Sequence, residues 1–167
     1  MVKQLLLPLA GVAVFIILVG LFTQNPSKLG LGKYFPTAVI EQQKSMTVGS
    51  KTIQVEVVNT EQTREKGLGG RSSLGTDNGM LFVFDTKPVT PTFWMKDMLI
   101  PLDMIWISDS KIVKIDKHVP NQPANTPDEK LPIYTPGRAV DYVLEVNSGF
   151  SDSNNIKVGD SVILPTL

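Results

Sequence analysis

The chain has 167 residues with 16 basic and 16 acidic side chains, so its formal net charge at pH 7 is zero. It contains no cysteine and one histidine, which excludes a disulfide, a thiol nucleophile, an iron–sulfur cluster and a histidine-rich zinc site. The length suits about one ordinary domain, the balanced charge provides no basic stripe for a nucleic acid, and the sequence indicates no cofactor or metal.

An uncharged apolar segment covers residues 5–22 near the N-terminus. This length is just sufficient to cross a bilayer as a helix, and Lys3 precedes it as in a signal anchor or a signal peptide. No convincing pair of small residues marks a peptidase site after it. We therefore predict an uncleaved transmembrane anchor over residues 1–23, with a cleaved signal as the alternative.

The anchor predicts a single-pass protein of the cytoplasmic membrane whose C-terminal domain lies outside the cytoplasm. If the segment is cleaved, the domain is secreted instead. Residues 24–44 contain proline and glycine and show little periodicity, so they read as a linker. The folded domain is then expected to cover residues 45–167.

The domain opens with a predicted β-hairpin and a short helix. Apolar and polar residues alternate over residues 52–58, and the turn Gly49-Ser50 precedes them. Thr60 is a suitable helix N-cap, and the glycines from Gly67 onward end the helix.

Two apolar runs, residues 80–84 and 102–107, predict strands buried on both faces. Side chains alternate along a strand, so Asp103 is expected to point the same way as Ile105 and Ile107. A carboxylate on that face needs a hydrogen-bonding or ionic partner.

The remaining segments predict further strands and one long loop. Residues 111–117 alternate, with Val113 and Ile115 expected inward, and residues 119–136 form a proline-rich loop. Residues 142–146 predict a strand in which Glu145 interrupts an apolar run. The expected fold is mainly β, an antiparallel sandwich or partly closed barrel with one short α-helix, preceded by the N-terminal transmembrane helix.

Four segments stand out as specific motifs: TREKGLGGR (63–71), NGMLFVF (78–84), FWMKDMLIPLDMIWI (93–107) and YVLEVNSGF with IKVGDSV (142–162). Together they resemble the DUF192 family, an uncharacterised family of bacterial and archaeal domains. The resemblance covers about residues 45–165. It implies a mainly β fold, and it implies no reaction because no activity is assigned to the family.

The chain departs from the family pattern in three places. Asp97 and Met98 stand where the family has Asn and Thr, and Gly69-Gly70 precede Arg71. Many members carry two cysteines near residues 125–131, and this chain has none there. These departures weigh against a site that needs a neutral amide at position 97 and remove a thiol role.

The sequence suggests a ligand groove built from the residues around the FWMKD motif and the proline-rich loop. Its expected members are Arg71, Phe93, Trp94, Met95, Lys96, Asp97 and Asp103. Each has a structural alternative: the aromatic and methionine side chains are more often core, and Lys96 is more often a solvated charge. His118 is expected at the surface, with no evident serine partner.

Asp97 and Asp103 suit an acid–base pair for hydrolysis if they lie close together. We instead expect Asp103 to pair structurally with Arg64 or Arg71. The function favoured by the sequence is a non-catalytic binding or accessory module of the cell envelope, with an unknown envelope ligand or protein as partner. The alternatives are a hydrolase of an envelope polymer that uses Asp97 and Asp103, and a structural partner of another membrane protein.

Overall fold

The computed structural model describes residues 43–167. The predicted transmembrane anchor over residues 1–23 and almost all of the predicted linker lie outside the described residues. Within residues 43–167, no helix has the length and apolar character needed to cross a membrane.

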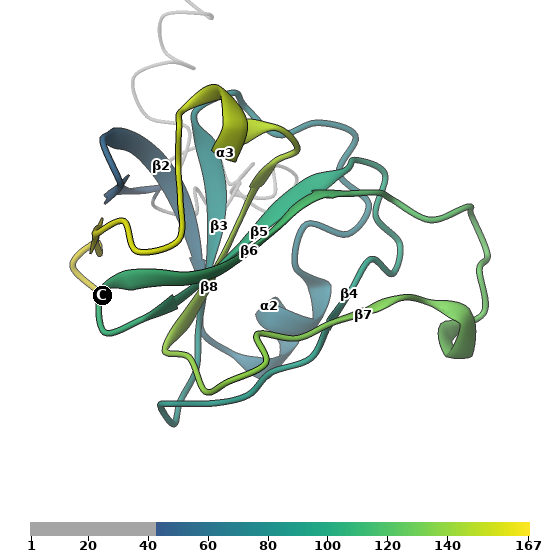
Figure 1. Ribbon diagram of the computed structural model, residues 1–167. Coiled ribbons are helices and arrows are strands. Elements are labelled where there is room, and N and C mark those ends of the chain that lie inside the picture. The colour runs from purple at the N-terminus through teal and green to yellow at the C-terminus, as the bar shows by residue number, and fades with distance from the viewer. Residues whose placement is uncertain (1–42) are drawn as a thin grey trace, which may run out of the picture. The chain divides into compact units, whose positions relative to one another are not determined.

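A seven-stranded sheet forms the frame of the domain (Figure 1). Its strands lie in the order β6 (Lys111–Val119), β5 (Leu102–Ser108), β8 (Tyr142–Asn147), β3 (Asn78–Val83), β2 (Lys51–Val58), β1 (Lys44–Val48) and β9 (Val162–Ile163). A β-bridge between Lys111 and Ser161 brings the last edge back to the first. The sheet is therefore a nearly closed barrel, which confirms the mainly β prediction and selects the barrel over the sandwich.

One strand pair departs from the predicted antiparallel arrangement. β2 and β3 run parallel, with Val57 opposite Leu81, whereas the other pairs in this sheet are antiparallel. Parallel neighbours need a crossover connection, and the chain makes it through α2 (Glu61–Lys66). The crossover places α2 outside the barrel, where it later forms one side of a pocket.

The predicted helix forms because its ends are capped locally. The Thr60 side chain accepts from the backbone N–H of Thr63, and the Thr63 hydroxyl accepts from the backbone N–H of Thr60. These reciprocal bonds satisfy backbone donors that the first helical turn leaves open. Gly67, with φ of 47°, ends the helix.

Apolar side chains form separate clusters on the two faces of the sheet. On β5, all of whose residues are buried, Ile105 and Ile107 belong to the cluster inside the barrel. Met104 and Trp106 belong to the cluster on the outer face. The prediction that residues 102–107 are buried on both faces is confirmed, and the alternation of the strand explains it.

The outer cluster is covered by a two-stranded sheet, which we call the β4–β7 ribbon. In it β4 (Phe93–Trp94) pairs antiparallel with β7 (Ile133–Tyr134). The proline-rich segment 119–136 was predicted to be a loop, yet it supplies β7 and a turn of 3₁₀-helix, η3 (Asp128–Lys130). Pairing with β4 orders this part of the segment.

The prediction for β6 is wrong in one detail. Ile115 packs against the cluster inside the barrel, but Val113 packs against the outer cluster. The register between β5 and β6 shifts next to Trp106, where a β-bulge adds a residue to β6. The extra residue moves Val113 to the other face and leaves Ile112 inside.

Candidate functional site

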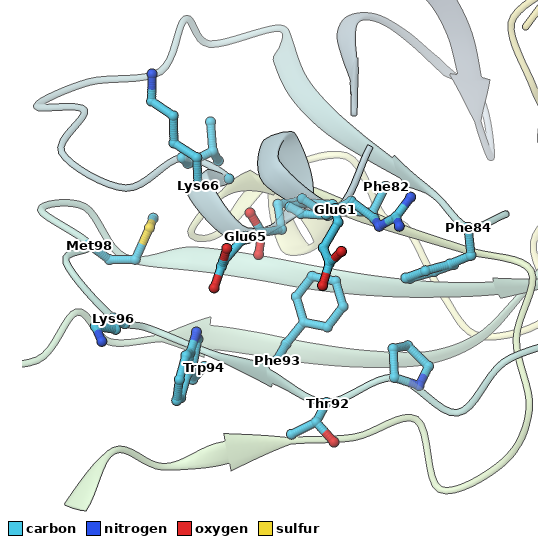
Figure 2. A pocket seen from close by; sticks show the side chains of 15 residues that line it. Glu61, Glu65, Lys66, Phe82, Phe84, Thr92, Phe93, Trp94, Lys96 and Met98 are labelled. Atoms are coloured by element: carbon cyan, nitrogen blue, oxygen red, sulfur yellow. The ribbon is translucent and has the colours of Figure 1, made fainter. Parts of the chain in front are cut away.

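A pocket of about 330 Å³ opens between α2, β3, β4 and β8 (Figure 2). We call it the aromatic pocket, because Phe82, Phe84, Phe93 and Trp94 line it. The segment that includes Lys96 and Met98 closes one side, and Glu145 is the lining residue supplied by β8. The volume is within the range of small-molecule sites.

Edge-to-face ring contacts hold the aromatic wall in place. The Phe93 ring lies 4.9 Å from that of Phe82 at 77° and 5.5 Å from that of Trp106 at 81°. Trp106 is fully buried, so Phe93 is fixed against the outer cluster. Trp94, the next residue, also lines the pocket and is 44 % exposed.

Arg64 fixes α2 over the sheet. Its guanidinium donates to the carbonyl oxygens of Asn59 at 2.8 Å and Val83 at 2.9 Å, and to the Asp85 carboxylate at 3.1 Å. The same guanidinium lies 5.8 Å from the centre of the Phe84 ring. Arg64 therefore serves as an anchor between the helix and β3, and its donors are engaged there.

Glu145 is a nearly buried acidic group in the aromatic pocket. It is 5 % exposed and stands between Met80 of β3 and Met104 of β5, the residues directly opposite it in the sheet. Among the described residues, no donor forms a hydrogen bond with its carboxyl group. Burial raises the pKa of Glu145 to about 8, because the apolar surroundings disfavour the charged form.

The charged side chains around the opening of the aromatic pocket point in different directions. In Figure 2 the carboxylates of Glu61 and Glu65 point from α2 toward the cavity, whereas the Lys66 ammonium points away from it. Lys96 is engaged outside the cavity by Asp128, with 2.6 Å between Nζ and Oδ2. Hydrogen bonding to Asp128 raises the pKa of Lys96.

A second hollow, of about 760 Å³, lies between the segment after β4 and the proline-rich loop. We call it the loop pocket; its lining includes Met95, Lys96, Asp97 and residues 121–126. Asp97 is exposed at its edge, in the left-handed backbone region at φ of 56°. The loop pocket contains no nearly buried charged side chain comparable with Glu145.

The predicted groove residues thus divide into three groups. Phe93, Trp94 and Lys96 line the aromatic pocket, while Met95, Asp97 and again Lys96 line the loop pocket. Arg71 and Asp103 line neither. The residues of the FWMKD motif are therefore divided between two hollows, and the single groove expected from the sequence is not formed.

Asp103 does not pair with an arginine, so that prediction is wrong. Its fully buried carboxylate accepts the backbone N–H groups of His118 at 2.9 Å, Gly149 at 3.0 Å and Ser151 at 2.9 Å. Gly149 is the N-cap of α3 (Phe150–Ser153), whose N-terminal turn Asp103 therefore binds. The side chain does point inward with Ile105, as expected.

The two arginines expected near Asp103 have acidic partners elsewhere. Arg71 forms a double contact with the Glu56 carboxylate of β2, with both N–O distances at 2.5 Å. Arg64 binds Asp85. The first pair joins the crossover connection to β2, and the second joins α2 to the segment just after β3.

A hydrogen-bonded network on the surface surrounds His118. Its Nδ1 lies 3.1 Å from the Ser148 hydroxyl and its Nε2 lies 2.9 Å from the Asp152 carboxylate. Hydrogen bonds from Lys117 and then His118 lower the pKa of Asp152. The sequence analysis found no serine partner for His118, because Ser148 lies on a different part of the chain.

This network has the residue types of a nucleophilic triad without its surroundings. The His118 side chain is 59 % exposed, and neither pocket includes it. The backbone N–H groups of His118, Gly149 and Ser151 all donate to Asp103. They are therefore not available as an oxyanion hole, and the geometry supports a structural role.

Within residues 43–167, no group of three or more His, Asp or Glu side chains is arranged to hold a metal ion.

Comparison with known families gives a match over residues 43–164 to DUF192, described as "Uncharacterized ACR". The chain belongs to the DUF192 family. A comparison with curated proteins finds no match.

Two solved structures resemble this DUF192 domain. One is a protein of unknown function from Novosphingobium aromaticivorans DSM 12444, 27 % identical, with a TM-score of 0.68 over 77 % of this chain and 90 % of that one. The other, from Sinorhizobium meliloti 1021, is named as a candidate transcription regulator. It is 28 % identical, with a TM-score of 0.64 over 74 % of this chain and 95 % of that one.

The sequence of this DUF192 domain did not predict that acidic residues line the aromatic pocket. Glu145 is an acidic residue inside the apolar run YVLEV, and this position sets it apart in the sequence. The strand pattern alone does not assign it to a pocket. No sequence feature distinguishes Glu61 and Glu65 from other acidic residues on the exposed side of a helix. Only the position of α2 over the sheet brings them to the pocket.

Proposed function

We propose that this protein is a non-catalytic binding module of the cell envelope that holds a small ligand in the aromatic pocket. The observation that carries the proposal is Glu145: a nearly buried carboxyl group that no described residue binds, in a pocket lined with aromatic rings. A buried polar group without a partner costs about 1–3 kcal/mol. A ligand that binds to the carboxyl group offsets this cost.

The pocket has the usual composition of a small-molecule site. Such sites are mostly apolar, with a few polar groups that fix the orientation of the ligand. Here the rings of Phe82 and Phe93 supply the apolar surface and Glu145 supplies the polar group. The exposed face of Trp94 extends the apolar surface toward solvent.

The rival function, hydrolysis of an envelope polymer by Asp97 and Asp103, has less support. Glycoside hydrolysis needs two carboxyl groups on either side of one bond. Asp103 is bound by three backbone N–H groups beneath α3, and Asp97 lies at the edge of the loop pocket. The two carboxylates belong to different surroundings, which favours binding over hydrolysis.

The envelope location is part of the same proposal and rests on the sequence. Residues 5–22 carry no charge and are long enough to cross a bilayer. On this basis the domain is anchored in the cytoplasmic membrane and lies outside the cytoplasm, or is secreted if the segment is cleaved.

A second function, structural partner of another membrane protein, has its own supporting observation. Trp94 and Ile133 are directly opposite each other in the β4–β7 ribbon and are 44 % and 65 % exposed. Cross-strand partners share a face, so the two side chains form one exposed apolar surface. Such surfaces often bind proteins when they are large enough.

Methionine methyl groups provide a direct test of ligand binding. The full-length chain, labelled with ¹³C at its methionine methyl groups and purified in detergent, is screened with small aromatic fragments of neutral, cationic and anionic type. Binding in the aromatic pocket shifts the methyl signals of Met98, which lines it, and of Met80 and Met104, which flank Glu145. Met46, inside the barrel, is the internal control.

The same spectra separate the alternatives. Met95 lines the loop pocket and not the aromatic pocket. A fragment that shifts the methyl signal of Met95 but not those of Met80 and Met104 therefore binds in the loop pocket. If no fragment shifts the signals of Met80, Met98 and Met104 relative to Met46, the proposed binding function is overturned.

A further inference from the structure

We propose that the aromatic pocket binds an organic cation, an ammonium group attached to a small apolar or aromatic body, with the Glu145 carboxylate as its counter-ion. This inference rests on the proposed binding function, because it names the ligand class of the same pocket. Three features of the pocket support it independently.

The first feature is the chemistry of the buried polar group. An ionised carboxylate only accepts hydrogen bonds, and within residues 43–167 no donor reaches Glu145. An ammonium group brings both hydrogen-bond donors and the opposite charge. A neutral donor supplies only the hydrogen bond, so the charge pairing with ionised Glu145 is special to a cationic ligand.

The second feature is the aromatic wall. Phe82, Phe84, Phe93 and Trp94 all line the pocket that contains Glu145. A cation within about 6 Å of a ring centre is attracted by the negative face of the ring. The cations of the protein already use this attraction nearby, since Lys96 lies 5.4 Å from the centre of the Trp94 ring.

The third feature is the charge at the opening. Of the cationic side chains that line the pocket, Arg64 is bound by Asp85 and Lys96 by Asp128, and Lys66 points away from the cavity. The carboxylates of Glu61 and Glu65 point toward the cavity in Figure 2. The acidic side chains at the opening thus face the cavity while the cationic ones are paired or turned away, an arrangement that favours a cationic ligand over an anionic one.

The charged groups that line the pocket around Glu145 also determine how binding depends on pH. They come from α2 and from the segment after β4, and they are Glu61, Arg64, Glu65, Lys66 and Lys96. The neighbouring strands contribute only the apolar side chains of Met80 and Met104 opposite Glu145. Within residues 43–167, no cation is thus placed to keep Glu145 ionised in the free protein.

Burial raises the pKa of Glu145 to about 8, so the free protein holds this proton at pH 6 and releases it when a cation binds. The dissociation constant of a cationic ligand should therefore increase about tenfold for each pH unit below about 7 and level off above about 8.

The test compares three probes of similar shape on the full-length chain: the phenethylammonium ion, neutral 2-phenylethanol and the anion 3-phenylpropionate. Binding is followed through the methyl signals of Met80, Met98 and Met104 and the fluorescence of Trp94. We expect the ammonium probe to bind at least about tenfold more tightly than either analogue at pH 8. We expect its affinity to fall as the pH is lowered to 6.

Two variants make the result specific. Glu145→Gln keeps the shape and removes the charge, so the ammonium probe should lose about tenfold or more in affinity together with its pH dependence. Glu129→Gln is the matched control, because it makes the same change at an exposed residue that lines neither pocket; its effect should stay below about twofold.

The cation can belong to a free amine or to a lysine side chain of a protein. A fourth probe, Nα-acetyl-lysine methylamide, distinguishes the two. Tighter binding of phenethylammonium assigns the site to a free amine, and tighter binding of the lysine derivative assigns it to a protein. Either result supports the cation inference.

If 2-phenylethanol binds in the pocket as tightly as the ammonium probe, or Glu145→Gln leaves the ammonium affinity unchanged, the cation inference fails while the proposed binding function stands. If none of the fragments of any charge reaches the pocket, the proposed function itself fails.

Discussion

Asp103 accepts a hydrogen bond from the backbone N–H of His118 at 2.9 Å. Its carboxylate also accepts the N–H groups of Gly149 and Ser151, so one buried side chain joins β5 to β6 and to the first turn of α3. His118 has a positive φ of 52°, which marks the place where the end of β6 bends toward the carboxylate. Asp103 therefore determines local structure and not the chemistry of a pocket.

Replacing Asp103 by Asn should destabilise the domain by about 2–4 kcal/mol. The amide keeps one oxygen as an acceptor, but its NH₂ group cannot accept the hydrogen bonds of the backbone donors that it faces. Hydrogen bonds to a charged group contribute about 1.5–3 kcal/mol each. Denaturant melts of the full-length variant measure the change. Asp97→Asn, at an exposed position, is the control and should stay within about 0.5 kcal/mol of the wild type.

Combining Asp103→Asn with Arg71→Ala should give additive losses within about 0.5 kcal/mol, because the two side chains bind different groups. A coupling of about 1 kcal/mol or more would restore the arginine pairing that the sequence suggested.

The buried carboxyl group of Glu145 predicts a loss of stability as the pH rises. The unfolded chain releases this proton near the ordinary pKa of 4.5, and the folded chain holds it to about 8. Between these values the unfolded state binds fewer protons, so the free energy of unfolding falls by about 1.4 kcal/mol per pH unit. The penalty is absent below about pH 4.5 and constant above about pH 8.

Urea melts of the wild type and Glu145→Gln at pH 5, 6, 7 and 8 should therefore diverge, with the variant increasingly more stable. Met80→Leu, which leaves Glu145 unchanged, is the control and should follow the wild-type slope. Parallel curves for the wild type and Glu145→Gln would contradict the raised pKa.

The ion pair between Arg71 and Glu56 should contribute to the attachment of the crossover connection to β2. Both N–O distances are 2.5 Å, and the side chains are 33 % and 12 % exposed. A double-mutant cycle with Arg71→Ala and Glu56→Ala should give a coupling of about 1–3 kcal/mol. Arg71→Lys should restore less than half of it, because an ammonium group cannot make the double contact. A coupling near zero would show that the pair is only a surface contact.

The apolar segment over residues 5–22 predicts the location of the protein. A reporter that is active only outside the cytoplasm, fused after Leu167, should give signal, and the full-length fusion should stay in the membrane fraction after a salt wash. A reporter active only inside the cytoplasm is the matched control and should give none. Signal from the cytoplasmic reporter would overturn the proposed envelope location, and release of a shortened soluble protein would indicate cleavage.

Most helices and strands of this domain could be predicted from short sequence patterns. The alternation over residues 52–58, the buried run over residues 102–107 and the Thr60 cap each predict an element that the structure contains. The same alternation correctly directed Asp103 to the side of Ile105. These predictions succeed because strand period, helix capping and turn chemistry depend on residues a few positions apart.

Which side chains and backbone donors come into contact depends on the tertiary structure. The donors that bind Asp103 lie 15, 46 and 48 positions along the chain, and a parallel crossover places α2 above Glu145. Which polar groups a buried carboxyl group meets depends on strand order and on how the crossover packs. Neither has a periodic signature in the sequence, so Asp103 meets three backbone donors whereas Glu145 meets none among residues 43–167.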